Sequence, residues 1–184
     1  SANDHPSGPF LPRDSRYDEV CRRLGWDGER IPRTEIPEMH LVPAPVRRLA
    51  ARARRRPIAF TLSRRGEAEA FMEVLHEPLR RQGVDVWWVD GQARSDVPGL
   101  DPMAWTNHVF RDGTERASGA RALLLTRHGG WGSHRDPAHF TGDVHSDWPV
   151  LRFEVPYTAA AGWGLVPWQS HDIGGFYDPR GRAP

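Results

Sequence analysis

The sequence predicts an α/β protein with a parallel sheet, in the form of a (β/α)8 barrel. Predicted strands and helices alternate along the chain with short connections, which is typical of a parallel sheet. Four predicted strands end close to a charged residue, and these residues are Asp90, Arg127, Asp143 and Asp172. Because the carboxyl ends of barrel strands converge on one face, the four side chains are expected to line one pocket. An open doubly wound sheet is the alternative, but the sequence lacks the Gly-rich phosphate-binding turn of that fold.

Length and composition are those of one globular domain. The 184 residues are 38% hydrophobic and 27% charged, with a net charge of +1, which is enough for a substantial core. No apolar run reaches about 18 residues, so no membrane span is expected. The near-zero net charge argues against a nucleic-acid partner, and the basic run of residues 46–56 is interpreted as a solvated helix face. The single cysteine, Cys21, excludes an intrachain disulfide.

The organisation expected is a single partial barrel domain over residues 1–184. Residues 1–56 are rich in Pro and Gly and are expected to form a loop-rich, insertion-like region with at most a short helix near residues 17–25. Residues 57–184 are expected to hold the core strand–helix units.

The clearest predicted element is a helix over residues 66–83, which Gly83 suits as a C-terminal stop. Its apolar positions recur at helical spacing and are Ala68, Phe71, Val74, Leu75 and Leu79. Pro78 is expected to kink this helix. The apolar run of residues 57–62 before it is a predicted strand, and the β-branched and aromatic run of residues 84–90 after it is another.

The same alternation continues toward the end of the chain. A helix is predicted over residues 102–113, ending at Gly113. The elements predicted after it are strands over residues 120–127 and 138–143, a helix region interrupted by prolines over residues 146–162, and a strand over residues 163–172.

Helix capping is the ordinary explanation for an Asp at a strand end. Three such Asp residues together with an Arg in the same layer favour a shared pocket instead. Most of the eight Trp residues are expected in the core, but Trp88 lies two residues before Asp90, so strand alternation puts both on one face. A Trp beside a carboxylate suits a sugar, because the ring stacks on the apolar sugar face while the carboxylate accepts from hydroxyl groups.

A metal site is the first rival interpretation. Asp143 and His145 lie in a Gly-Asp-Val-His sequence similar to the Gly-Asp-x-His element of metallophosphoesterases, and His134, His139 and His171 are near in sequence. The further Asn, His and Asp elements of that fold are missing, as is a tight zinc spacing such as HExxH. The sequence therefore indicates no metal and no cofactor.

Three segments occur together at characteristic spacing: "GVDVWWVDGQ" (83–92), "LLLTRHGGWGSHRDPAHFTGDVHSDW" (123–148) and "SHDIGGF" (170–176). An Arg stands 16 residues before the second Asp, and a third Asp stands 29 residues after it. In order and spacing these segments resemble glycoside hydrolase family 31, the α-glucosidase and α-xylosidase family. "NDHPSG" near the start resembles the end of an earlier barrel strand. The resemblance implies a TIM barrel of which this chain supplies roughly the third to seventh strand units.

The resemblance also implies catalytic roles for two carboxylates. Asp90 matches the nucleophile, and Asp143, in Thr-Gly-Asp, matches the general acid/base. Many members continue the nucleophile as Asp-Met-Asn-Glu, whereas this chain continues it as Gly91 and Gln92. This difference from the family pattern is expected to affect which substrate is used more than whether the protein is active.

Five further residues match sugar-binding positions of the family. Arg127 and Asp172 match residues that bind hydroxyl groups of the sugar in the cleaved subsite. Trp88 matches an aromatic wall of that pocket. Phe140 stands where many members have Trp, and Phe176 stands where many members have Phe.

The activity implied is retaining hydrolysis of O-glycosyl bonds in α-glycosides by two Asp carboxylates, within carbohydrate metabolism. The partner implied is a carbohydrate substrate, with no nucleic acid and no membrane, and the oligomeric state is unknown. The alternative from another class is a catalytically inactive carbohydrate-binding relative; a metal-dependent phosphoesterase is less favoured.

The chain is expected to be a fragment of a longer enzyme. A full barrel takes roughly 250 residues, and the first residue is Ser rather than Met, so the localisation is left unknown. An unclosed sheet exposes edges and apolar faces, which can leave the 184-residue chain inactive by itself.

Overall fold

The computed structural model describes most of the chain. The described residues are 1–27, 31, 43–45, 47–48, 56–91, 93–127, 132–136, 138–178 and 180. The predicted basic helix face of residues 46–56 lies largely outside them. Within the part that is described, none of the helices has the length and apolar character of a membrane span.

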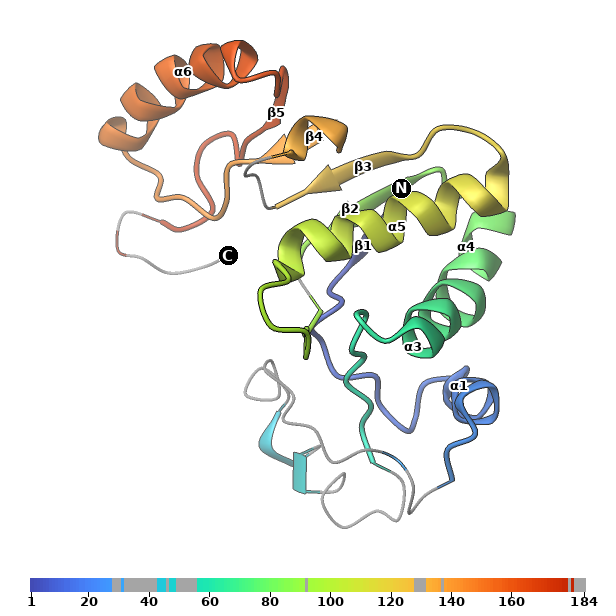
Figure 1. Cartoon of the computed structure of the whole chain (residues 1–184). Helices are drawn as coiled ribbons and strands as arrows, with labels where there is room; N and C mark the ends of the chain where they lie inside the picture. The colour runs from blue at the N-terminus through green and yellow to red at the C-terminus, as the bar shows by residue number, and fades with distance from the viewer. Residues whose placement is uncertain are drawn as a thin grey trace.

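Five parallel strands form one sheet in which the spatial order is the order of the chain (Figure 1). The strands are β1 (Ala2–Asp4), β2 (Val86–Val89), β3 (Leu123–Thr126), β4 (Ala138–Phe140) and β5 (Trp168–Ser170). Each strand pairs in parallel with the next. A sheet that adds parallel strands in sequence order is that of a barrel, so the predicted fold class is confirmed.

The Pro- and Gly-rich beginning of the chain contributes more structure than its composition indicates. It supplies β1, which places Asn3 beside Trp88 of β2, and helix α1 (Tyr17–Leu24). The strand predicted over residues 57–62 is wrong, because in this stretch Ile58 makes only an isolated antiparallel bridge with Phe10. Its apolar residues are buried in the core, so the apolar run indicates burial rather than strand pairing.

The predicted helix over residues 66–83 is confirmed, with one irregular turn. It consists of α3 (Arg65–Ala70), a π-helical segment η2 (Phe71–His76) and α4 (Glu77–Arg81). Pro78 has no N–H to donate, and in a regular helix its ring would crowd the carbonyl four residues earlier. The wider turn just before it accommodates Pro78, and the backbone N–H of Glu77 accordingly bonds the carbonyl of Met72.

Helix α5 (Pro102–Ser118) is longer than predicted. Gly113 does not end it. A Cβ at this position would meet the Met72 side chain at 3.0 Å, so Gly113 permits close approach of α5 and η2. The helix ends instead at Gly119, whose φ of 68° lies in the left-handed region that favours glycine.

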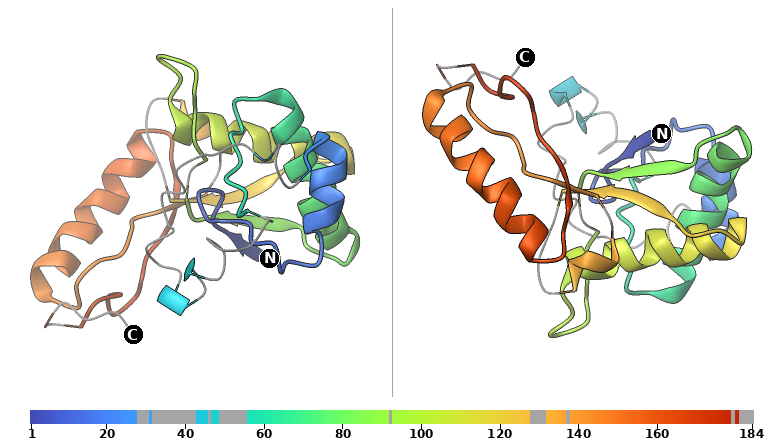
Figure 2. Two further views of the ribbon diagram at one scale, coloured as in Figure 1. Left: turned by 90° about the horizontal axis from the view of Figure 1, so that it is seen from below. Right: turned by 90° about the horizontal axis from the view of Figure 1, so that it is seen from above.

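Helix α6 (Trp148–Trp163) runs unbroken through Pro156, where an interruption was predicted. It lies beside β5 and far from α1 and α3 in the views of Figures 1 and 2. Among the described residues nothing covers its apolar side chains: Phe153 is 63% exposed and Trp163 is 91% exposed. The expectation that a partial barrel exposes apolar faces is therefore confirmed.

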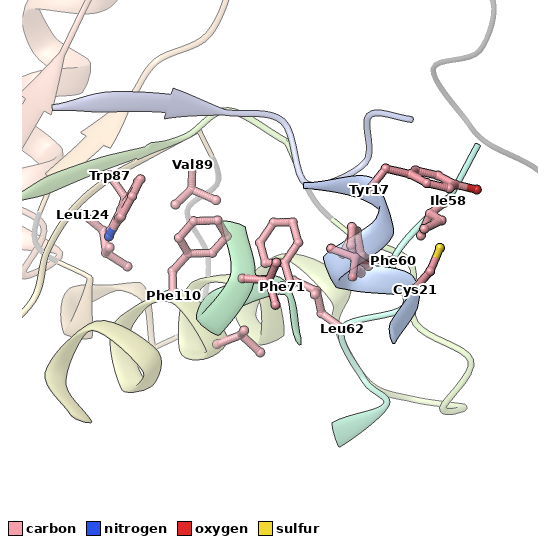
Figure 3. Close-up of a cluster of buried hydrophobic side chains, with 14 of the residues drawn as sticks. Tyr17, Cys21, Ile58, Phe60, Leu62, Phe71, Trp87, Val89, Phe110 and Leu124 are labelled. Atoms are coloured by element: carbon pink, nitrogen blue, oxygen red, sulfur yellow. The ribbon is translucent and has the colours of Figure 1, made fainter. Parts of the chain in front are cut away.

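The core lies between the sheet and helices α1, η2 and α5. Alternate strand residues point into it, and Figure 3 shows Trp87, Val89 and Leu124 of the sheet facing Phe110 of α5. The other face of the sheet carries Trp88, which is only half-buried. Side chains alternate along a strand. Asp90 and Arg127, which lie two positions beyond Trp88 and Leu125, therefore fall on this second face.

Candidate active site

One arginine joins the two carboxylates that the sequence singled out. Arg127 follows β3, and its Nε and Nη2 donate to Oδ1 of Asp90 at 2.7 and 2.6 Å. Its Nη1 donates to Oδ1 of Asp143 at 2.9 Å. The Asp90 side chain is 11% exposed and that of Asp143 is 28% exposed. Two carboxylates from the ends of β2 and β4, the strands on either side of β3, therefore share one guanidinium in a partly buried site.

Asp90 has two further partners that the sequence analysis did not assign to the site. The amide Nδ2 of Asn3 donates to Oδ2 of Asp90 at 3.0 Å. The Nε2 of His5 lies 2.9 Å from the same oxygen. Asn3 and His5 belong to "NDHPSG", but a strand of three residues with a single alanine has no apolar pattern from which to recognise it.

Neither carboxylate caps the helix that follows it. Asp101 caps α5, since its side chain accepts from Met103 N and Ala104 N. Asp147 caps α6, since its side chain accepts from Val150 N at 2.9 Å. Helix capping therefore explains Asp101 and Asp147. It does not explain the two carboxylates that bind Arg127.

The turn after β4 places Asp143 beside Arg127. The backbone N–H of Thr141 donates to Ser170 O of β5 at 3.1 Å, which extends the β4–β5 pairing by one residue. Gly142 follows with a φ of 99°, a conformation that side-chain-bearing residues rarely adopt. The glycine therefore allows the chain to leave the sheet sharply, with Asp143 directly after the turn.

Two aromatic rings flank the guanidinium. The rings of Trp88 and Phe140 are 5.0 Å apart at 80°, an edge-to-face arrangement. The Cζ atom of Arg127 lies 5.9 Å from the Trp88 ring and 5.2 Å from the Phe140 ring. These contacts bring together five of the seven residues predicted for the site, namely Trp88, Asp90, Arg127, Phe140 and Asp143.

The last two predicted residues lie beyond β5. Asp172 is partly buried, and its Oδ2 atom has no hydrogen-bond partner among the described residues. Phe176 donates its backbone N–H to Val144 O at 2.8 Å, next to Asp143. Its ring packs edge-on against Tyr177 at 5.0 Å. The segment of Phe176 is thus beside the turn that carries Asp143.

Charge within the site shifts two pKa values upward. Burial opposes the charge of Arg127, but its hydrogen bonds to Asp90 and Asp143 outweigh burial and raise its pKa further. For Asp172, burial raises the pKa and the neighbouring charge of Asp143 adds to it, while Arg127 acts in the opposite direction. The burial that raises the pKa and the Oδ2 atom without a partner among the described residues both indicate a carboxylate that is incompletely satisfied within this part of the chain.

The replacement Asp172→Asn is expected to increase the free energy of unfolding at neutral pH. The folded pKa of Asp172 is raised above its ordinary value of 3.8. The contribution of Asp172 to the free energy of unfolding is therefore fully present below pH 3.8. This contribution is lost as the pH rises through the folded pKa. The gain from Asn should shrink as the pH falls toward 3.8, which urea unfolding at neutral and acidic pH would measure. Equal stability of both proteins at neutral pH would contradict this account.

Two of the histidines considered for a metal site, His139 and His171, have other partners. Nε2 of His139 contacts the backbone oxygens of Ser133 and Asp136 at 3.0 and 2.8 Å. The ring of His171 contacts the hydroxyls of Thr141 and Thr158. Across the described residues, no three His, Cys, Asp or Glu side chains are grouped so that they could hold a metal ion.

A groove of about 760 Å³ lies on the other face of the sheet, between α3–η2–α4 and α5. Met72, His76, Trp87 and Trp105 are among its lining residues, and none of the seven predicted site residues borders it. The groove is thus separate from the carboxylate pair, since β2 lies between them.

The fold and the paired carboxylates define a class, that of the TIM-barrel glycoside hydrolases. Residues 58–183, more than half of the chain, match the family model described as the glycosyl hydrolases family 31 TIM-barrel domain. The chain belongs to glycosyl hydrolase family 31 and forms part of its TIM-barrel domain, as the sequence motifs predicted.

Two individual relatives agree with this assignment. An alpha-xylosidase of Saccharolobus solfataricus is 34% identical over 118 residues, which cover 52% of this chain and 16% of the relative. The crystal structure of the GH31 alpha-xylosidase from Xanthomonas citri matches 97% of this chain and 20% of its own, with a TM-score of 0.60 and 18% identity. The second match supports the fold alone. The chain spans a fifth or less of the length of either relative.

Proposed function

We propose that this chain carries the catalytic carboxylates of a retaining α-glycoside hydrolase. The observation that supports this function best is the guanidinium of Arg127, which follows β3 and bonds Asp90 beyond β2 and Asp143 beyond β4. Retaining glycosidases use two carboxyl groups about 5–5.5 Å apart. A cation shared by both carboxylates holds them close together against their mutual repulsion.

In the first step, a carboxylate oxygen of Asp90 attacks the anomeric carbon of the sugar. The bond from that carbon to the glycosidic oxygen breaks, and Asp143 gives its proton to the departing oxygen. The product is a glycosyl ester of Asp90 and a free alcohol. Protonation is needed because an alkoxide is a poor leaving group.

In the second step, Asp143 acts as a base. It takes a proton from water as the water oxygen attacks the anomeric carbon, and the ester bond to Asp90 breaks. Both carboxyl groups return to their starting states. Two inversions at one carbon leave the product with the configuration of the substrate.

The remaining predicted residues are proposed to hold the sugar in the cleaved subsite. Oδ2 of Asp172 is buried and has no partner in the described part of the chain, and a sugar hydroxyl would supply a donor. Trp88 and Phe140 offer apolar surface beside the carboxylates. The name of the Saccharolobus solfataricus relative favours an α-xyloside as the first substrate to test.

The test is a panel of aryl α-glycosides, beginning with the α-xyloside and the α-glucoside. It uses the protein as the cell makes it, including any sequence encoded on either side of this chain. Release of phenol with an α-configured sugar as the first product supports the proposal. Sugar binding without turnover across the panel would favour the inactive carbohydrate-binding relative instead, and β-configured first products would exclude retention.

A further inference from the structure

Side chains at the end of β1 point to both faces of the sheet. Asn3 and His5 point to the site face, where both contact Oδ2 of Asp90. Asp4 lies between them, so alternation turns its side chain to the helix layer. There its Oδ2 meets Nε2 of His76 at 2.6 Å. The end of β1 is therefore attached to the candidate nucleophile on one side and to the π-helical segment on the other.

The ring of His76 is fixed at both nitrogens. It is only 4% exposed, and its Nδ1 lies 2.8 Å from the carbonyl oxygen of Phe71. A carbonyl only accepts, so Nδ1 carries a proton, and one more proton lies between Nε2 and Asp4. The rings of Phe71, Trp87 and Phe110 pack around the imidazole with centroids within 5.0 Å. The packing and both hydrogen bonds prevent rotation of this side chain.

The π-helical turn accounts for the position of His76. This wide turn ends at His76 and accommodates Pro78, two residues further on. Such a turn adds a residue to the helical repeat and shifts the direction of the side chains that follow, and π-helical turns are frequent at functional sites. His76 is therefore turned toward the sheet, between Phe71 and the end of β1.

Asp4 also connects directly to the backbone of the site. The N–H of Asp90 donates to the carbonyl oxygen of Asp4 at 2.9 Å, one residue beyond the pairing of Asp4 with Val89. Asp4 is thus held through its side chain by His76 and through its backbone by Asp90. Its two neighbours in sequence, Asn3 and His5, hold the Asp90 carboxylate.

We infer that buried His76 and partly buried Asp4 form a positioning pair that sets the orientation of the Asp90 carboxylate through Asn3 and His5. The inference rests on the proposed function, because it assigns the pair to the nucleophile of that reaction. Neither residue touches the substrate. Their effect is expected in kcat, since a displaced nucleophile slows the attack, whereas the groups that bind the sugar stay in place.

The experiment compares three variants in the protein as the cell makes it. Asp4→Leu removes the partner of His76, whereas Asp4→Asn keeps a group of the same shape that can still hydrogen-bond to Nε2. His76→Phe keeps a ring but removes both polar contacts, and it is an independent test if Asp4→Leu fails to fold. In Asp4→Leu and His76→Phe, kcat per folded molecule is expected to fall about 10- to 100-fold. KM should stay within about threefold, and Asp4→Asn should keep about a third of the kcat or more.

Glu67→Leu is the matched control. Glu67 is as buried as His76 and its carboxylate accepts from Thr61 N at 2.7 Å, but among the described residues it contacts no group that binds Asp90. Its loss should lower stability and leave kcat per folded molecule unchanged. If Asp4→Leu and His76→Phe behave like Glu67→Leu, the pair is merely structural and the inference is overturned.

A second measurement does not depend on activity. The backbone amide signal of Asp90 in ¹H–¹⁵N NMR spectra should move in Asp4→Leu and His76→Phe, and stay in place in Glu67→Leu. Unmoved signals in the first two variants would overturn the inference. If the parent protein hydrolyses no α-glycoside, the proposed function fails, while the amide signal still decides whether His76 and Asp4 position Asp90.

Discussion

Asp90→Asn is expected to lower kcat by at least about 10³-fold while the fold is retained, because an amide oxygen is too weak a nucleophile to form the glycosyl ester. Asn has the shape of Asp and still accepts at Oδ1, where Arg127 donates. The loss should therefore appear in turnover rather than in stability. Initial rates with an aryl α-glycoside, together with circular dichroism spectra, measure both.

A matched control is present at the other end of the same strand. Asp85 lies just before β2 and is exposed, so Asp85→Asn should leave kcat within about twofold of the parent. A mechanism-based fluoro-sugar adds an independent test, since it traps the glycosyl ester for peptide mass spectrometry. Labelling of a carboxylate other than Asp90 would exclude Asp90 as the nucleophile.

Asp143→Ala is expected to slow glycosides with poor leaving groups by on the order of 10²–10⁴. Aryl glycosides of acidic phenols need little protonation, so their first step should be affected much less. Azide should partly restore turnover, because a small anion can attack the trapped ester from the side that Asp143 vacates. The measurement is the dependence of rate on the pKa of the leaving group, variant against parent.

Asp147→Ala provides the control for this variant. Asp147 caps α6, four residues beyond Asp143, and its loss should cost about 0.5–2 kcal/mol of stability. It should slow all substrates alike and show no rescue by azide. An Asp143→Ala protein with the same leaving-group dependence as the parent would mean that the proton comes from another residue.

The strand-end residues and their convergence could be predicted from the sequence. In a parallel sheet the carboxyl ends share one edge, so Asp90 and Arg127 had to be neighbours once β2 and β3 were recognised. Alternation placed Trp88 on the same face as Asp90. These arguments need only the direction of each strand and the number of residues between two positions along it.

Contacts that depend on packing could not be predicted. Asn3 and His5 come from a strand too short and polar to have a recognisable pattern. Gly113 was expected to end α5, because a local signal does not show that Met72 packs against it. Likewise, Pro78 predicted a distortion of the helix but not a π-helical turn, which depends on the partners that His76 finds in the core.

The sequence-ordered sheet also has a consequence for synthesis on the ribosome. Asn3 lies in β1, His5 directly follows β1 and Asp90 directly follows β2, so all three are synthesised before β4. Asp143 follows Asp90 by roughly fifty residues, which is about 3–10 s of translation at roughly 5–20 residues per second. The proposed nucleophile and its two partners are therefore synthesised before the proposed proton donor. On the proposed mechanism, a nascent or interrupted chain of intermediate length holds the nucleophile without the acid that glycosides with poor leaving groups require.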